Sequence, residues 1–81
     1  MPTLATRRLD LRGLKCPLPV LRARRELARL NPGETLVIET TDPMSAIDIP
    51  HLLNETGDRL DVMEQEGEVL RFAILRLAPG A

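Results

Sequence analysis

Residues 11–21, LRGLKCPLPVL, contain the change from a strand pattern to a helix pattern and also the single cysteine of the chain. Just before the cysteine, residues 8–12 alternate polar and apolar side chains, which predicts a short half-buried strand with Leu9 and Leu11 facing inward. Gly13 ends this strand pattern. The stretch therefore places the cysteine in the loop that leaves the first predicted strand.

The segment from Pro17 to Leu30 has the periodicity of an amphipathic helix. Its apolar side chains share one face: Val20, Ala23, Leu27 and Leu30. Its basic side chains lie on the opposite face, with Arg24 at the border: Arg22, Arg25 and Arg29. The sequence Asn31-Pro32-Gly33 stops the helix. We therefore expect a helix with one side in the core and one basic side.

A second strand and a second helix follow. Residues 34–41, ETLVIETT, are rich in β-branched types and predict a strand. Residues 44–57 predict a helix that ends with Gly57 as its C′ cap. Pro50 either kinks this helix or marks a restart that Asp48 caps.

The chain ends in a predicted β-hairpin, with residues 59–65 and 68–77 joined by a tight turn at Glu66-Gly67. The order is βαβαββ, and a helix between the first two strands predicts that they are parallel neighbours. The expected fold class is α/β (α+β): a two-layer sandwich in which a mixed four-stranded sheet carries two helices on one face. The opposite face should carry apolar side chains: Val37, Met63, Ala73 and Leu75.

This topology predicts where a site would form. The loops that leave two parallel strands lie at the same edge of a sheet, where binding sites tend to form. Cys16 and the Asp42-Pro43 turn should therefore be neighbours.

The composition narrows the class of protein. With 81 residues, 43% of them hydrophobic and 28% charged, the chain predicts one soluble domain, 1–81, with a core at about 8–77. A net charge of −1 and a single aromatic residue, Phe72, argue against nucleic-acid binding, which uses basic patches and stacking platforms. No run reaches the ~20 apolar residues of a membrane span, and the amino end has no apolar signal segment. We therefore expect no membrane insertion and a cytoplasmic location.

A single cysteine excludes a disulfide within the chain. With one cysteine and one histidine, a closed zinc site would need carboxylates for half of its ligands, so we expect no metal and no cofactor. Cys16 is then either a small buried hydrophobe or a free thiol with a chemical role.

The residues around Cys16 favour a chemical role. A residue before proline avoids the α region, so Cys16 is expected to be the N-cap, with Pro17 at N1 and Pro19 at N3. Pro19 has no N–H, which leaves Leu18 as the main backbone donor to the sulfur. The helix dipole and Lys15 should lower the pKa of the thiol modestly. The hypothesis is an exposed nucleophilic thiol.

The other polar residues near the predicted site can each be interpreted in two ways, one structural and one functional. The arginines of the first helix form either a solvated face, with Glu26 pairing Arg22 or Arg29, or a docking strip for an acidic partner. His51 is either a surface residue or a general base for the thiol. Asp42 and Asp48 are turn or cap residues, or they contribute to partner binding.

Several motifs together resemble the TusA/SirA-like family of small sulfur carriers, over a span from about Leu9 to Arg76. Cys16-Pro17-Leu18-Pro19 matches the CPxP motif of that family. Further matches are the PGE of Pro32, Gly33 and Glu34, and Asp42-Pro43 followed by Asp48-Ile49-Pro50.

The resemblance implies the same two-layer fold and a sulfurtransferase-type carrier that acts stoichiometrically in each transfer. Cys16 would accept a sulfane sulfur as a persulfide from a cysteine desulfurase or a rhodanese-like donor. It would then pass the sulfur to a cysteine of an acceptor protein in tRNA thiolation, molybdenum-cofactor maturation or sulfur oxidation.

Under this hypothesis, Lys15, Pro17 and Pro19 support the sulfur site. Partner-binding residues would be Arg22, Arg24, Arg25, Asp42 and Asp48. One alternative is a regulatory or transport-accessory module that binds a partner and carries no sulfur, and a weaker one is a tRNA-binding protein.

Overall fold

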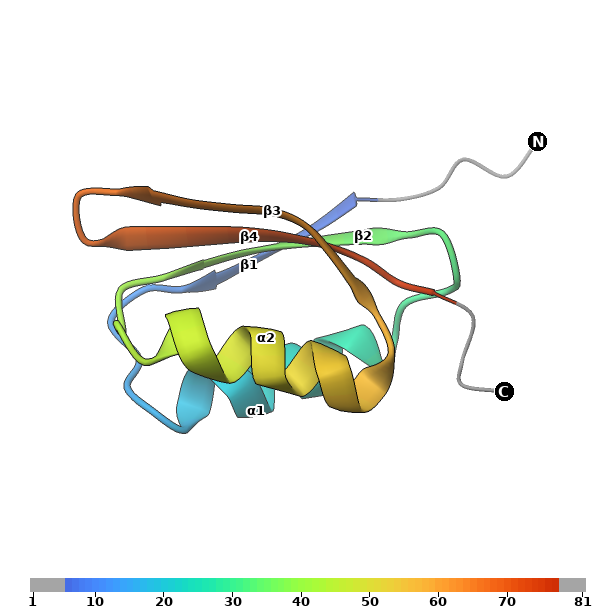
Figure 1. Cartoon of the computed structure of the whole chain (residues 1–81), viewed down its shortest axis with the longest axis horizontal. Coiled ribbons are helices and arrows are strands. Elements are labelled where there is room, and N and C mark those ends of the chain that lie inside the picture. Colours follow the sequence, from blue (N-terminus) through green and yellow to red (C-terminus); the bar gives the residue numbers. More distant parts are fainter. Residues whose placement is uncertain (1–5, 78–81) are drawn as a thin grey trace.

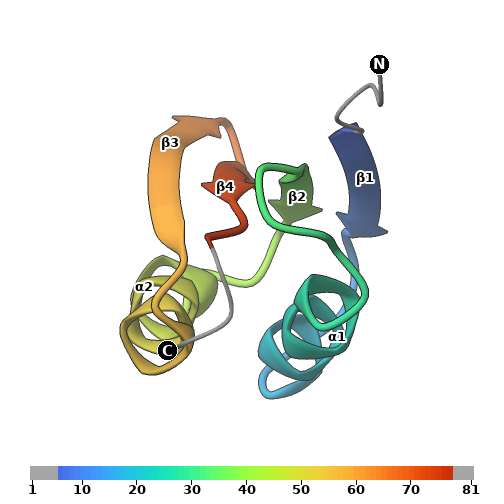
Figure 2. The same cartoon turned by 90° about the vertical axis from the view of Figure 1, so that its right-hand side faces the viewer.

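The computed structural model describes residues 6–77 and confirms the βαβαββ order. The elements are β1 (Thr6–Leu11), α1 (Leu18–Leu27), β2 (Thr35–Thr40), α2 (Ser45–Thr56), β3 (Arg59–Glu66) and β4 (Val69–Leu75). The sheet order is β1-β2-β4-β3, with β1 and β2 parallel and the other neighbours antiparallel. Both helices cover the same face of the sheet (Figures 1 and 2). The predicted two-layer sandwich is confirmed, while the outer parts of the predicted domain, residues 1–5 and 78–81, lie outside the described residues.

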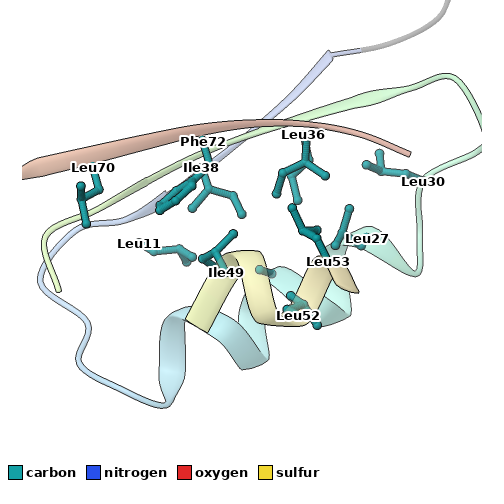
Figure 3. Packing of buried hydrophobic residues seen from close by; sticks show 12 residues of the cluster. Leu11, Leu27, Leu30, Leu36, Ile38, Ile49, Leu52, Leu53, Leu70 and Phe72 are labelled. Atoms are coloured by element: carbon teal, nitrogen blue, oxygen red, sulfur yellow. The ribbon is translucent and has the colours of Figure 1, made fainter. Parts of the chain in front are cut away.

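The core lies between the sheet and the two helices (Figure 3). Its buried apolar side chains are Leu11, Ala23, Leu27, Leu30, Leu36, Ile38, Ile49, Leu52, Leu53, Leu70, Phe72 and Ile74. Buried and partly buried residues alternate along β2 and β4, because one face of these central strands packs on the helices. The predicted apolar face of α1 is confirmed, with Val20 partly buried against the core.

β3 contains a β-bulge that its sequence does not reveal. Leu60 and Val62 pair with adjacent residues of β4 rather than with residues two apart. An extra residue in one strand shifts the alternation of faces by one. Met63 therefore pairs with Phe72 and shares its face, so its predicted place on the open face is wrong. The other residues predicted for the open face lie there, partly buried: Val37, Ala73 and Leu75.

α2 is one helix, although Pro50 lies inside it. A restart capped by Asp48 is therefore wrong, because Asp48 lies in the first turn of that same helix. Gly57 ends α2 in the left-handed conformation, with φ 80°, and its N–H donates to the carbonyl oxygen of Leu53 at 2.8 Å. The predicted C-terminal cap is thus confirmed.

The end of the sheet farthest from Cys16 is closed by a buried ion pair. Arg76 Nη1 donates to Asp58 Oδ2 at 2.8 Å, and the N–H of Leu77 donates to Asp58 Oδ1 at 3.0 Å. The backbone of Arg76 also bonds the segment before β2, through Gly33 and Glu34. These contacts fasten the end of β4 to the loops around it.

Candidate functional site

Two loops meet at one edge of the sheet, and Cys16 lies in the first of them (left side of Figure 1). The loop after β1 and the loop after β2 leave parallel strands at the same edge, as the topology requires. The N–H of Gly13 donates to Thr41 Oγ1 at 2.9 Å, and the N–H of Cys16 donates to Asp42 Oδ2. The predicted proximity of Cys16 and the Asp42-Pro43 turn is confirmed.

The two loops line a cleft of about 390 Å³. Its lining residues are Gly13, Leu14, Lys15, Cys16, Thr41, Asp42 and Pro43. A second cleft of about 390 Å³ shares Thr41 and Pro43 and extends to the turn between β3 and β4. Cys16 is exposed and free, so its sulfur is within reach of a partner.

Asp42 holds the two loops together. Besides the bond from Cys16, its Oδ1 accepts the N–H of Met44 at 3.0 Å, and its backbone carbonyl accepts the N–H of Ser45 at 3.0 Å. The carboxylate thus begins the turn into α2 and fixes the backbone of the cysteine at the same time. The interpretation of Asp42 as a turn residue is confirmed.

α1 begins one residue later than expected. Pro17 is the N-cap, Leu18 is the first helical residue, and Cys16 lies outside the helix, joined to Pro17 by a cis peptide bond. The N–H of Leu18 donates to the carbonyl oxygen of Lys15 at 2.8 Å and not to the sulfur. The predicted N-cap role of Cys16 is wrong. The N–H of Leu18, which was the expected donor to the sulfur, is already bonded to a backbone carbonyl, and Pro19 has no N–H to replace it.

Asp48, in the first turn of α2, contacts the sulfur. Cys16 Sγ donates a hydrogen bond to Asp48 Oδ2 at 3.3 Å. This bond and burial raise the pKa of the Cys16 thiol, and the negative charges of Asp48 and Asp42 add to the effect. The predicted lowering of the pKa is wrong, because the sulfur faces carboxylates and lies outside the first turn of α1.

The basic side of α1 remains largely solvated. Among residues 6–77, Arg22, Arg25 and Arg29 form no ion pair, and Arg24 lies 3.6 Å from Glu55 of α2. The expected pairing of Glu26 with an arginine of its own helix is wrong. Glu26 Oε1 instead lies 2.9 Å from Arg7 Nη1, because β1 runs beside α1.

Apolar side chains are also exposed at the amino-terminal ends of both helices. We call these residues the apolar rim: Leu18, Leu21, Met44 and Ile47. The rim was not predicted from the sequence, although Leu18 and Leu21 fall outside the apolar face of α1. Exposed apolar side chains near a cleft are typical of surfaces that bind other proteins.

The remaining candidates lie away from the sulfur. His51 is 74% exposed, and its Nε2 lies 3.6 Å from Glu55 Oε1. Within the described range, Asp48 is the only side chain hydrogen-bonded to Sγ, which leaves no observation for His51 as a general base. Residues 6–77 contain no group of three side chains suited to bind a metal ion. No helix in that range is long and apolar enough to cross a membrane.

The fold and the site define a class of small two-layer α+β domains that expose a single thiol at the edge of a mixed sheet. A family model described as Sulfurtransferase TusA matches residues 7–76. The chain therefore belongs to the TusA sulfurtransferase family.

Two comparisons agree with this assignment. The chain is 39% identical over 66 residues to the sulfur carrier protein TusA of Allochromatium vinosum, covering 82% of this chain and 87% of that protein. Its fold is similar to the crystal structure of a SirA-like protein from Desulfitobacterium hafniense, with a TM-score of 0.74 and 24% sequence identity. The likeness covers 91% of this chain and 99% of the other and confirms the fold.

Proposed function

We propose that this protein is a sulfur carrier that holds a sulfane sulfur as a persulfide on Cys16 and passes it to an acceptor cysteine. The observation that carries the proposal is the exposed thiol of Cys16 in a cleft at the sheet edge. Membership in the TusA family supports the same chemistry.

Each transfer is an exchange between a thiol and a sulfur–sulfur bond. In loading, the Cys16 sulfur attacks the outer sulfur of a donor persulfide; a new S–S bond forms, the donor S–S bond breaks, and the donor thiolate takes the proton. In delivery, an acceptor thiolate attacks the outer sulfur on Cys16. A new S–S bond forms on the acceptor, the S–S bond on Cys16 breaks, and Cys16 is released as a thiolate. Both steps need a sulfur that another protein can approach, and the open cleft provides this access.

The residues beside Cys16 support this chemistry in different ways. Pro17 and Pro19 restrict the start of α1, and Pro19 is buried, so the cysteine loop leaves the core at a fixed place. Lys15 is exposed in the same loop and lines the cleft, where its charge would attract the anionic outer sulfur of a persulfide.

Protein partners would dock around the cleft. Arg22, Arg24 and Arg25 are exposed on the side of α1 away from the core and would bind acidic surfaces of a donor or an acceptor. Asp42 and Asp48 would come within reach of any partner that approaches the sulfur. The donor would be a cysteine desulfurase or a rhodanese-like protein, and the acceptor would determine which thiolation, cofactor or sulfur-oxidation pathway is served.

The proposal includes a cytoplasmic location. A reducing compartment keeps a free thiol available for sulfur transfer, whereas an oxidising one promotes disulfide formation. Direct nucleic-acid binding is not part of the proposed function, because the net charge is −1 and the chain holds a single aromatic residue.

The test is persulfide formation on the intact protein. The protein is incubated with a cysteine desulfurase and cysteine without reductant, and its mass is compared with that of Cys16→Ser treated identically. We expect a gain of one sulfur atom that reductant reverses and that the variant lacks. A protein that gains no sulfur here, or from a rhodanese and thiosulfate, would contradict the proposal and favour a regulatory interaction module.

A further inference from the structure

The Cys16 thiol lies among negative charges, which is unusual for a reactive cysteine. Reactive thiols are commonly placed beside cations or helix amino termini, which favour the thiolate. Here Sγ lies 3.3 Å from a carboxylate oxygen of Asp48, and Asp42 contributes a second carboxylate at the same cleft.

The nearby cations do not offset these carboxylates. Lys15 lies in the cysteine's own loop but makes no hydrogen bond with Sγ within the described residues. Arg12, at the end of β1, is bound to Asp10 through two hydrogen bonds of 2.8 and 2.9 Å. The groups that face the sulfur from its own loop, from the β2–α2 loop and from α2 therefore sum to a negative charge.

Asp48 is held where it meets the sulfur. Its own N–H donates to the carbonyl oxygen of Met44 at 2.8 Å, within the first turn of α2. The cysteine backbone is held from the same direction by Asp42. The thiol and its acceptor, which are 32 residues apart in sequence, are thus positioned by two anchored backbones.

We propose that Asp48 is a positioning residue that keeps the empty carrier in its thiol form. Asp48 accepts the S–H hydrogen bond until loading removes the proton from Cys16. This inference rests on the proposed function of Cys16 as the sulfur-accepting residue. It assigns Asp48 a role in the chemistry of the carrier itself, in addition to any contact with partners.

Loading changes the contact between the two residues. The proton of Cys16 leaves with the donor thiolate, and the outer sulfur takes its place on Sγ. Sγ then has no hydrogen to donate to Asp48. A persulfide is a stronger acid than a thiol, so the outer sulfur ionises more readily, and the two carboxylates repel it toward the open side of the cleft.

Asp48 thereby distinguishes the empty carrier from the loaded one. The thiolate is the form that reacts with electrophiles and oxidants, so an empty carrier held as a thiol reacts slowly with both. The loaded carrier has its reactive atom one bond farther from Asp48 and is less affected. The consequence is a carrier whose sulfur reacts more slowly when the carrier is empty than when it is loaded.

The test is the alkylation rate of Cys16 by iodoacetamide, measured across a series of pH values. We expect Asp48→Asn to increase the rate several-fold at neutral pH and to move the inflection of the pH profile to lower pH. Asp48→Glu, which retains a carboxylate, should keep a profile close to that of the original protein. Asp61→Asn is the matched control, because Asp61 pairs with Arg59 on the edge strand β3, and its profile should be unchanged.

A synthetic peptide of residues 14–19, LKCPLP, provides a reference that does not depend on any variant folding. The inflection for the intact protein should lie at higher pH than that for the peptide. An intact-protein inflection at or below the peptide value would overturn the inference, as would an Asp48→Asn profile that is unchanged or slower. A slower profile would instead assign Asp48 the role of a base.

The loaded carrier supplies the second half of the test. Persulfide prepared on the original protein and on Asp48→Asn is mixed with a small thiol, and release of the outer sulfur is followed. We expect Asp48→Asn to change the rate of sulfur release by a smaller factor than it changes the rate of alkylation. An equal factor would overturn the distinction between the empty and loaded forms. Alkylation requires no persulfide, so failure of Asp48 as a positioning residue is separable from failure of the proposed function.

Discussion

The two ends of the sheet each present a carboxylate to a hydrogen-bond donor, but the two settings differ in burial and charge. At the far end, Asp58 has a side chain that is 1% exposed, and it accepts bonds from Arg76 and from the N–H of Leu77. At the cysteine end, Asp48 is partly buried and accepts a bond from a neutral thiol. The far end pairs a carboxylate with a cation, whereas the cysteine end places two carboxylates near an exposed sulfur.

The far end of the sheet should therefore matter more for stability, and the cysteine end more for the reactivity of the thiol. A buried carboxylate that loses its cation leaves a charge without compensation, so the far end is sensitive to substitution. The loops at the cysteine end are exposed, so water replaces lost contacts and substitutions there should alter reactivity more than folding.

The largest expected effect on stability comes from Asp58→Ala. It leaves Arg76 partly buried without its partner, and breaking such a pair costs about 3–5 kcal/mol in the free energy of unfolding. Urea denaturation measures this loss, and the double variant Asp58→Ala/Arg76→Met should recover part of it. A loss below about 1 kcal/mol, the range of an exposed pair, would show that the far end does not stabilise the fold.

A smaller effect is expected from Asp42→Ala at the cysteine end. The substitution removes the acceptor for the N–H groups of Cys16 and Met44, and each net hydrogen bond contributes about 0.5–1.5 kcal/mol. Hydrogen exchange should accelerate at the amide of Cys16 and remain slow in β2 and β4. A loss of stability as large as that of Asp58→Ala would erase the contrast between the two ends.

The smallest effect on the protein itself is expected from charge reversal on α1. Arg22→Glu should slow loading by a cysteine desulfurase several-fold at low salt, while loading from a small persulfide and the free energy of unfolding stay unchanged. Arg29→Glu is the matched control, because Arg29 is also exposed but lies beyond the far end of α1. Equal effects of the two variants, or no reduction of the effect by salt, would argue against docking near the start of α1.

Much of the architecture was predictable because it depends on short-range periodicity. The alternation in residues 8–12 and the apolar face of α1 required only the repeats of two and 3.6 residues. The proximity of Cys16 to Asp42 followed from the rule for parallel strands joined by a helix. The cap at Gly57 followed from the freedom of glycine to adopt positive φ, which a helix end requires.

Other features depended on long-range contacts and escaped prediction. The bulge in β3 arises from pairing with β4, so Met63 changed face without any sign in its own strand. Glu26 took Arg7 as its partner because β1 lies beside α1, and a pairing rule within one helix does not consider a neighbouring strand. The apolar rim became apparent only when the amino-terminal ends of both helices were seen at one edge of the fold.

The order of elements, the core faces and the placement of one cysteine in a loop at the sheet edge could be deduced from the amino-acid pattern alone. These properties follow from local propensity and from the apolar pattern of each segment. The electrostatic environment of that cysteine, in contrast, depends on long-range contacts. The charge near an atom depends on which distant side chains the fold brings within a few ångströms, and here the fold brings Asp48 to the sulfur, so the pKa of the thiol is raised where the local motif predicted that it would be lowered.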